Sequence, residues 1–261
     1  MRLSRLALPA FVICLLVIGH CSFAAAKEFD GIWFLGFNTK TVPFNQLAVR
    51  QAIAHTLDRQ AIISNIVSGE SVPASFIPPG LTGFDPDLQP YKPNLAYAKA
   101  LMRKAGFPPH KPALKKITLL HTDGVKTIEI AKQVQKDLKQ LGLKIERRQI
   151  RYYDNTLWAE ELNSGRHQLF LMGYKAEPDQ LFTAEAGAKT TDSARLLAPL
   201  FSSTGEANFT GYSQADVDLF LEQLMLIDPS LAGERTAKLQ EVNRQLYRDL
   251  PALLLFYIEK I

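Results

Sequence analysis

The amino-acid sequence predicts a mixed α/β protein, in which helices flank one sheet. Three observations support this class. Residues 116–150 read as strand, helix and strand, an order that joins parallel strands. Residues 168–172 are apolar and uncharged, which is typical of a central strand. Residues 252–258 form another strongly apolar strand after two helical segments. A composition of 47% hydrophobic and 21% charged residues fits a folded globular protein.

Residues 1–26 have the pattern of a secretory signal peptide. Two cations, Arg2 and Arg5, precede an apolar run over 6–19 and three alanines at 24–26. A membrane anchor is the alternative, although the apolar run is short for a bilayer span. Lipidation at Cys21 is a third possibility, but His20 stands where that pattern requires a small residue. Cleavage after Ala26 would remove both cysteines, leaving residues 27–261 without a disulfide.

The first half of residues 27–261 is expected to contain one strand and two helices. Residues 32–38 read as a strand, and 46–67 read as one helix from their apolar spacing. Residues 71–93 are rich in proline and glycine. They could form a surface connection, a functional loop or a structured wrap. Asn94 can cap a helix that runs to residue 105, with Gly106 just beyond its end.

The second half is expected to build most of the sheet. Strands at 116–121 and 143–150, joined by a helix at 125–141, predict a parallel right-handed crossover. A short helix at 158–162 precedes the central strand, and residues 174–192 read as a polar loop. Two helices then follow at 214–227 and 230–248, before the last strand.

No pattern in the sequence indicates catalysis, a metal or a cofactor. The nucleophile elbow, the phosphate-binding loop and the dinucleotide fingerprint are all absent, so we expect no enzyme. The four histidines after residue 26 lack the spacing of metal ligands. Removal of the leader would change the net charge from +4 to +2, and scattered cations argue against nucleic acid. No later segment is apolar enough to span a membrane.

Aromatic side chains favour a binding protein instead. Several of them could line a ligand cleft, although ordinary core packing explains most equally well. They are Trp33, Phe34, Phe37, Tyr152, Tyr153, Trp158 and Tyr174.

Five spaced blocks of sequence resemble the bacterial extracellular solute-binding proteins of family 5, which include dipeptide, oligopeptide and nickel binders. The first two are FLGFN at 34–38 and VRQAIAHTLDR at 49–59. IPPG at 77–80 and YAKALMRKAGF at 97–107 follow in order. LFSS at 200–203, with Asn208, GYS at 211–213 and DLPA at 249–252, completes the pattern. The resemblance covers residues 33–258.

The resemblance implies a periplasmic-binding-protein-like lobe of type II, with a mixed sheet and flanking helices. Such proteins capture a peptide or similar small solute without covalent chemistry and present it to an ABC permease in the inner membrane. In peptide-binding relatives, an Asp after a Gly-Trp pair holds the amino terminus of the peptide. Here Gly173-Tyr174 takes the place of that pair, and Glu177 stands where the Asp would fall. The candidate ligand-binding residues are Tyr174, Glu177, Asp179, Phe37 and Asn208.

The chain departs from the family in length. An N-terminal segment of the family pattern is missing, so we expect residues 27–261 to be its C-terminal region, one lobe plus a partial return to the other, truncated relative to the family. A fragment, a disrupted gene and a compact functional form are all consistent with this pattern. A separate chain could supply the missing lobe. Alternatively, the protein is an interaction or sensory scaffold derived from a binding protein. Truncation predicts an exposed apolar patch on the surface facing that lobe, and burial of Phe34, Phe37 and the Tyr174 loop together would contradict it.

Overall fold

The computed structural model describes residues 27–67, 71–176, 193–227 and 231–260. The signal-peptide prediction for residues 1–26 lies outside these ranges. In chain order the strands and helices are β1 (Phe29–Phe37), α1 (Leu47–Ala54), α2 (Arg59–Ile62), the π-helix η1 (Ile63–Val67), α3 (Leu95–Lys104), the 3₁₀-helix η2 (Pro112–Leu114), β2 (Ile117–Thr122), α4 (Val125–Leu138), the 3₁₀-helix η3 (Lys139–Leu141), β3 (Ile145–Ile150), α5 (Asn155–Asn163), β4 (Leu169–Lys175), α6 (Ser193–Phe201), α7 (Ala215–Leu226), α8 (Ala232–Asp249) and β5 (Ala252–Glu259).

Five strands form one mixed sheet in the order β3-β2-β4-β1-β5. Strand β2 pairs in parallel with β3 and β4, whereas β1 runs antiparallel to both β4 and β5. The expected parallel pairing across the strand–helix–strand unit is therefore confirmed. The apolar strand β4 lies in the middle of the sheet, as its uncharged sequence predicted.

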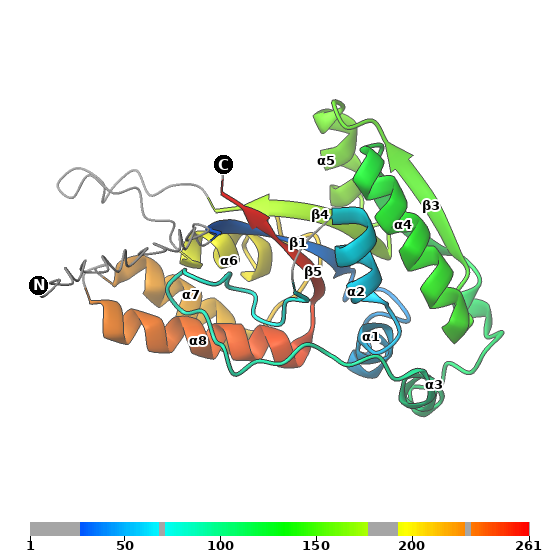
Figure 1. The fold of residues 1–261 in the computed structure, drawn as a ribbon, viewed down its shortest axis with the longest axis horizontal. Helices are drawn as coiled ribbons and strands as arrows, with labels where there is room; N and C mark the ends of the chain where they lie inside the picture. The colour runs from blue at the N-terminus through cyan, green and yellow to red at the C-terminus, as the bar shows by residue number, and fades with distance from the viewer. Residues whose placement is uncertain (1–26, 68–70, 177–192, 228–230, 261) are drawn as a thin grey trace, which may run out of the picture.

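Helices cover both faces of the sheet, so the protein has three layers (Figure 1). Alternation along β1 divides its side chains between two cores: Leu35 packs with α1, α3 and α4, and Phe34 packs with α6, α7 and α8. Both residues are buried. The mixed α/β class is confirmed.

The single helix expected over residues 46–67 is interrupted. Helix α1 ends at Ala54, and Asp58 begins the next helix by accepting a hydrogen bond from the backbone of Ala61 at 2.9 Å. The backbone nitrogen of Asp58 donates to the Asp137 carboxylate at 3.0 Å. A contact 79 residues away thus fixes the break, and apolar spacing alone does not reveal it.

Residues 71–93 form a structured wrap, one of the three possibilities that their composition left open. Asn243 of α8 holds this segment: its side-chain oxygen accepts from the backbone of Phe76 at 2.8 Å, and its nitrogen donates to Ser75 at 2.7 Å. Arg244 pairs with the buried Asp85 at 2.6 Å. These bonds satisfy the polar groups of the segment where helix and strand bonds are absent.

Two buried arginines connect the N-terminal helices to the C-terminal strand. Arg50 donates to the carbonyls of Phe44, Asp249 and Leu250, at 2.7, 2.6 and 2.9 Å. Arg59 donates to the carbonyls of three other segments, Pro73 at 2.9 Å, Leu254 at 3.0 Å and Tyr91 at 3.3 Å. These arginines of the VRQAIAHTLDR block therefore have structural partners almost 200 residues away.

Helix α6 was not predicted. Leu196, Leu197, Leu200 and Phe201 follow helical spacing and are buried, but Pro199 interrupts the pattern. Most of the preceding polar loop, residues 177–192, lies outside the described residues.

Candidate functional site

Four of the five strands end at the same edge of the sheet, which we name the carboxyl edge. It comprises the last residues of β2, β3, β4 and β5 and the first residues of the antiparallel β1. In open α/β sheets, ligands bind beyond the carboxyl ends of strands, because loops there leave a crevice between the flanking helices. The candidate site is sought at this edge.

An ion-pair network holds the β1, β4 and β5 part of the carboxyl edge. Lys175 at the end of β4 pairs with Asp30 at 3.0 Å and donates to the backbone oxygen of Glu259 at 3.1 Å. The Glu259 side chain pairs with Lys27 at 2.5 Å. Asp30 is partly buried and the other groups are exposed, so each pair adds little stability. Together they link the ends of β4 and β5 to the start of β1.

A groove beside this edge, the α6 groove, contains Tyr174. Its volume is about 390 Å³, and it lies between the end of β4, helix α6 and the turn after it. Arg195 and Glu206 supply opposite charges to its walls, and Met225 supplies an apolar side chain. The groove therefore presents an aromatic ring, a cation and an anion within one concavity, a combination suited to a zwitterionic ligand.

A second concavity, the β5 groove, lies on the other side of the same strand ends. It measures about 540 Å³, and its walls include Phe29, Phe256 and Ile258, with Lys27 and Glu259 at the rim. Tyr257 also lines it and donates its hydroxyl to the carbonyl of Ser75 at 2.9 Å. Burial raises the pKa of Tyr257, so this hydroxyl stays a neutral donor at physiological pH.

The most exposed aromatic pair of the edge follows β3. Tyr153 is 91% exposed and Tyr152 is 62% exposed, and their rings meet edge to face at 5.5 Å. Asp123, from the loop after β2, accepts a hydrogen bond from the backbone of Tyr152 at 2.7 Å. The hydrogen bond to Asp123 thus fixes the loop after β3, while the rings of Tyr152 and Tyr153 face solvent, which is unusual for large aromatic side chains.

The structure describes three of the five predicted site residues and brings only Tyr174 into a groove. Tyr174 lies half-buried in the α6 groove, whereas Glu177 and Asp179 fall outside the described residues. Phe37 is fully buried and stacks on Phe44 with ring centroids 6.0 Å apart, so it is a core residue and not a surface for a ligand. Its selection as a ligand contact is corrected, because both faces of β1 are covered by helices.

The side chain of Asn208 is hydrogen-bonded within the protein. Its amide nitrogen donates to the carbonyls of Ser202 and Tyr212, each at 2.8 Å, and its oxygen accepts from the Thr210 hydroxyl at 2.8 Å. These bonds close the turn between α6 and α7, which forms one wall of the α6 groove. Asn208 therefore shapes the groove through its backbone partners.

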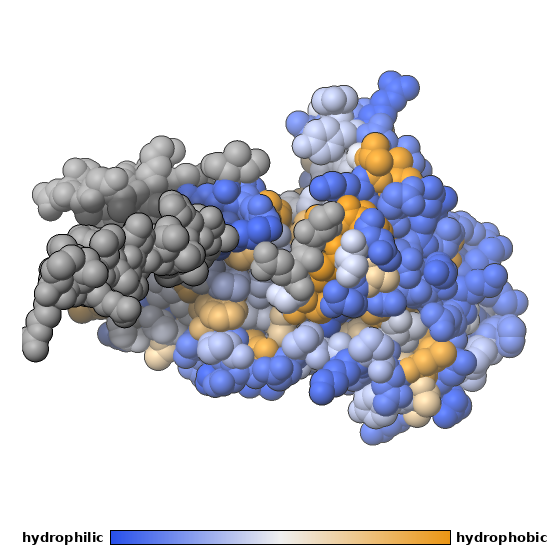
Figure 2. Space-filling view, in the orientation of Figure 1, coloured by the Kyte–Doolittle hydropathy of each residue, from blue (hydrophilic) through white to orange (hydrophobic). Residues whose placement is uncertain are grey.

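The exposed apolar patch expected from truncation stays a prediction. Phe34 and Phe37 are buried, Tyr174 is half-buried, and most of its loop lies outside the described part, so the stated test stays open. Val125, the first residue of α4, is 80% exposed. Figure 2 shows an apolar patch over the upper end of α4.

Sequence reasoning missed Arg195 and Glu206, which are supplied by the unpredicted helix α6 and its following turn. The helical spacing of residues 196–201 was the signal that could have located them. Among the described residues, no cluster of three histidine, cysteine or acidic side chains could hold a metal. None of the helices in the same ranges has both the length and the apolarity of a membrane span.

Residues 25–192 match the family model described as bacterial extracellular solute-binding proteins, family 5 Middle. The chain belongs to this family. The resemblance inferred from the spaced motifs is therefore confirmed. Over 233 residues the family member is 25% identical to the dipeptide-binding protein of Escherichia coli, an alignment that covers 86% of this chain and 40% of the relative. It is 29% identical over 155 residues to the oligopeptide-binding protein of Bacillus subtilis, covering 55% of the chain and 27% of that relative.

Solved structures confirm the fold as that of the type II periplasmic peptide-binding proteins. The murein tripeptide binding protein of Escherichia coli superposes with a TM-score of 0.74 at 22% identity, covering 90% of this chain and 43% of the other. A Helicobacter pylori periplasmic binding protein, solved with a peptide, gives 0.73 at 20% identity, with coverages of 90% and 44%. The chain thus spans less than half the length of these solved relatives.

Proposed function

We propose that this family member is the extracytoplasmic solute-binding component of a peptide-type ABC importer. On this proposal the carboxyl edge captures a peptide or similar small solute without covalent chemistry. The protein is secreted by its signal peptide and delivers the solute to a permease in the inner membrane. Because the chain spans about 40% of its first curated relative, a second polypeptide segment is proposed to cover the edge from the opposite side.

The observation that carries the proposal is the α6 groove at the end of β4. It brings Tyr174, Arg195 and Glu206 to one concavity at the edge where open α/β sheets bind ligands. A peptide has an ammonium group, a carboxylate and an apolar body. A carboxylate, a guanidinium and an aromatic ring are the side chains that recognise these three features.

Roles for the predicted residues follow from this chemistry. Tyr174 packs against the body of the peptide, and Glu177 pairs with its ammonium group. Asp179 is the alternative carboxylate, two residues further along the same loop. Charge-assisted hydrogen bonds of this kind are about twice as strong as neutral ones, so loss of the correct carboxylate has the larger effect.

Thermal unfolding of residues 27–261 with di-, tri- and oligopeptides tests the proposal. A ligand at a hundredfold excess over its dissociation constant stabilises the folded state by about 2.7 kcal/mol, and the melting temperature rises. Glu177→Gln and Tyr174→Ala should each reduce this rise. Tyr97→Ala is the matched control, because Tyr97 is 50% exposed on α3, away from the edge.

The outcomes separate the two functions considered for this chain. A cooperative melt that one peptide class raises, and that Glu177→Gln restores to the ligand-free value, supports solute binding. A cooperative melt that no peptide raises refutes solute binding by this chain alone and favours the interaction or sensory scaffold. If Tyr97→Ala reduced the ligand-induced rise in melting temperature as much as Glu177→Gln does, that result would also count against the assigned site.

A further inference from the structure

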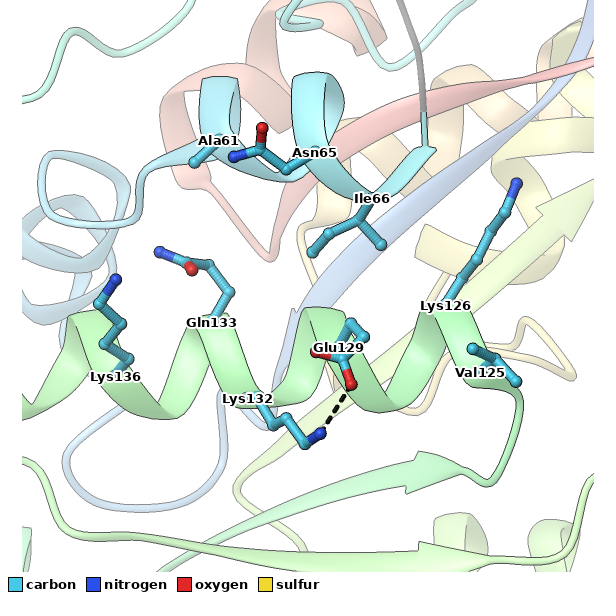
Figure 3. Close-up of a pocket in the computed structure, with 9 residues that line it drawn as sticks. All are labelled: Ala61, Asn65, Ile66, Val125, Lys126, Glu129, Lys132, Gln133 and Lys136. Atoms are coloured by element: carbon cyan, nitrogen blue, oxygen red, sulfur yellow. Dashed lines mark hydrogen bonds and ion pairs between the residues drawn. The ribbon is translucent and has the colours of Figure 1, made fainter.

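A further groove lies between η1 and helix α4, beginning where α4 follows β2. We name it the α4 groove. It has a volume of about 490 Å³ and is drawn in Figure 3. One wall is formed by Ala61, Asn65 and Ile66, and the other by Val125, Lys126, Glu129, Lys132, Gln133 and Lys136. The α6 groove of the proposed solute site shares none of these residues, and only Lys126 also lines the β5 groove.

The charge of this groove is predominantly positive. Its lining holds three lysines and one glutamate, and the glutamate is already paired, because Glu129 contacts Lys132 at 2.6 Å. Lys126 and Lys136 are exposed and have no ion-pair partner among the described residues. Two cations therefore remain available to an anionic partner, one at each end of the groove.

The opposite wall supplies polar and apolar groups between these two cations. Asn65 is exposed and its amide makes no hydrogen bond within the described part of the chain, while Ile66 descends toward α4 in Figure 3. Gln133 rises from α4 toward this wall. Both Asn65 and Ile66 belong to the π-helix η1, a rare local geometry that occurs often at functional sites.

Spacing decides the kind of partner. Ten residues of α-helix separate Lys126 from Lys136, about 15 Å along the axis at 1.5 Å per residue. In Figure 3 the two ammonium groups lie at opposite ends of the groove, so in this arrangement one small anion does not contact both. An extended peptide advances about 3.3 Å per residue, so acidic side chains four residues apart lie about 13 Å from each other.

We propose that the α4 groove binds an extended acidic segment of a partner protein. Two acidic residues, four positions apart, pair with Lys126 and Lys136. The apolar residue between them rests on Ile66, and the amides of Asn65 and Gln133 face the backbone of the segment. Charge complementarity selects the partner, and the short apolar contact fixes its register.

The test measures fluorescence anisotropy of a labelled peptide, Glu-Gly-Leu-Gly-Glu, with the full protein at low ionic strength. The variant K126E/K136E should bind about tenfold more weakly, since each exposed pair contributes up to about 1 kcal/mol and 1.4 kcal/mol is tenfold. The control K115E/K116E makes the same change in net charge at exposed residues before β2 and should bind as the wild type does. A second peptide, Glu-Glu-Gly-Leu-Gly, has the same charge with the wrong spacing and should bind more weakly.

Three results would overturn the proposal. The first is no saturable binding by the wild-type protein, and the second is equal loss in both lysine variants, which would indicate unspecific attraction. The third is equal affinity for the two peptides. Circular dichroism of each variant verifies folding, and N65A, which keeps the charge, provides a second variant that should weaken binding. Failure of solute binding at the carboxyl edge would leave this measurement unaffected, so the two proposals are tested independently.

Discussion

Arg59 is the side chain whose removal should most clearly weaken the connection between the N-terminal helices, the wrap and β5. It is buried, and its guanidinium donates to the carbonyls of Pro73, Leu254 and Tyr91. Burial lowers its pKa to about 10, which still leaves it charged at neutral pH. The informative substitution is Arg59→Met, which keeps an unbranched apolar stem and removes the donors.

The expected loss of stability follows from these bonds. A hydrogen bond from a charged donor contributes roughly 1.5–3 kcal/mol, so the two shorter bonds amount to roughly 3–6 kcal/mol. The guanidinium has no carboxylate partner among the described residues, and its removal recovers part of the cost of burying a charge. We therefore expect Arg59→Met to lower the free energy of unfolding by about 2–4 kcal/mol.

Urea unfolding followed by circular dichroism measures this change, and amide hydrogen exchange locates it. Exchange should accelerate in residues 73–91, because the wrap loses its bonds to Arg59 at Pro73 and Tyr91. Arg103→Met, on the exposed face of α3, is the control and should stay within about 0.5 kcal/mol of the wild type. A similarly small change for Arg59→Met, with unaltered exchange in the wrap, would refute the reasoning.

Three further substitutions test the core and the sheet. Phe37→Ala should lower the free energy of unfolding by about 3–5 kcal/mol, and the affinity of the folded fraction for peptide, measured by calorimetry, should not change. A specific loss of affinity would contradict its placement in the core. At Gly173 a Cβ atom would lie 2.2 Å from the Trp33 ring, so Gly173→Ala should cost about 1–3 kcal/mol and shift the tryptophan emission; an unchanged spectrum would argue against this contact. Burial lowers the pKa of His121 below its unfolded value near 6.5; a backbone hydrogen bond to Thr122 opposes this shift, and the charge of Arg147 adds to it. The contribution of neutral His121 to stability is therefore complete above about pH 6.5 and declines as the pH falls below it. His121→Gln should therefore flatten the decline measured by urea unfolding between about pH 7.5 and 5.5, and an unaltered slope would disprove this role.

Local patterns were sufficient to predict most of the sheet and its helices. The apolar period of α4 and the uncharged sequence of β4 report burial directly, because one or both of their faces meet other layers. The interruption at Asp58 and the course of the wrap were not predictable in the same way. Their hydrogen-bond partners, Asp137 and Asn243, lie 79 and 167 residues away, and no local pattern contains that information.

Local sequence patterns also predicted only part of the candidate site. Tyr174 was identified from its position after Gly173, and it does line a groove. Phe37 was chosen as an aromatic residue of the FLGFN block, but β1 is covered on both sides, so its aromatic ring indicates core packing. Arg195 was overlooked because Pro199 obscured the helix that supplies it.

The position of β1 between β4 and β5 affects how the protein is made. β1 is the first of the five strands to leave the ribosome, yet both of its neighbours in the sheet are synthesised much later, and β5 comes last. The Leu254 carbonyl that accepts a hydrogen bond from Arg59 likewise lies 195 residues further along the chain. Because such distant pairings form slowly, β1 has no partner strand until β4 is synthesised, and one of its edges stays unpaired until β5 follows. The sheet around β1 can therefore close only after the last strand, β5, has been synthesised.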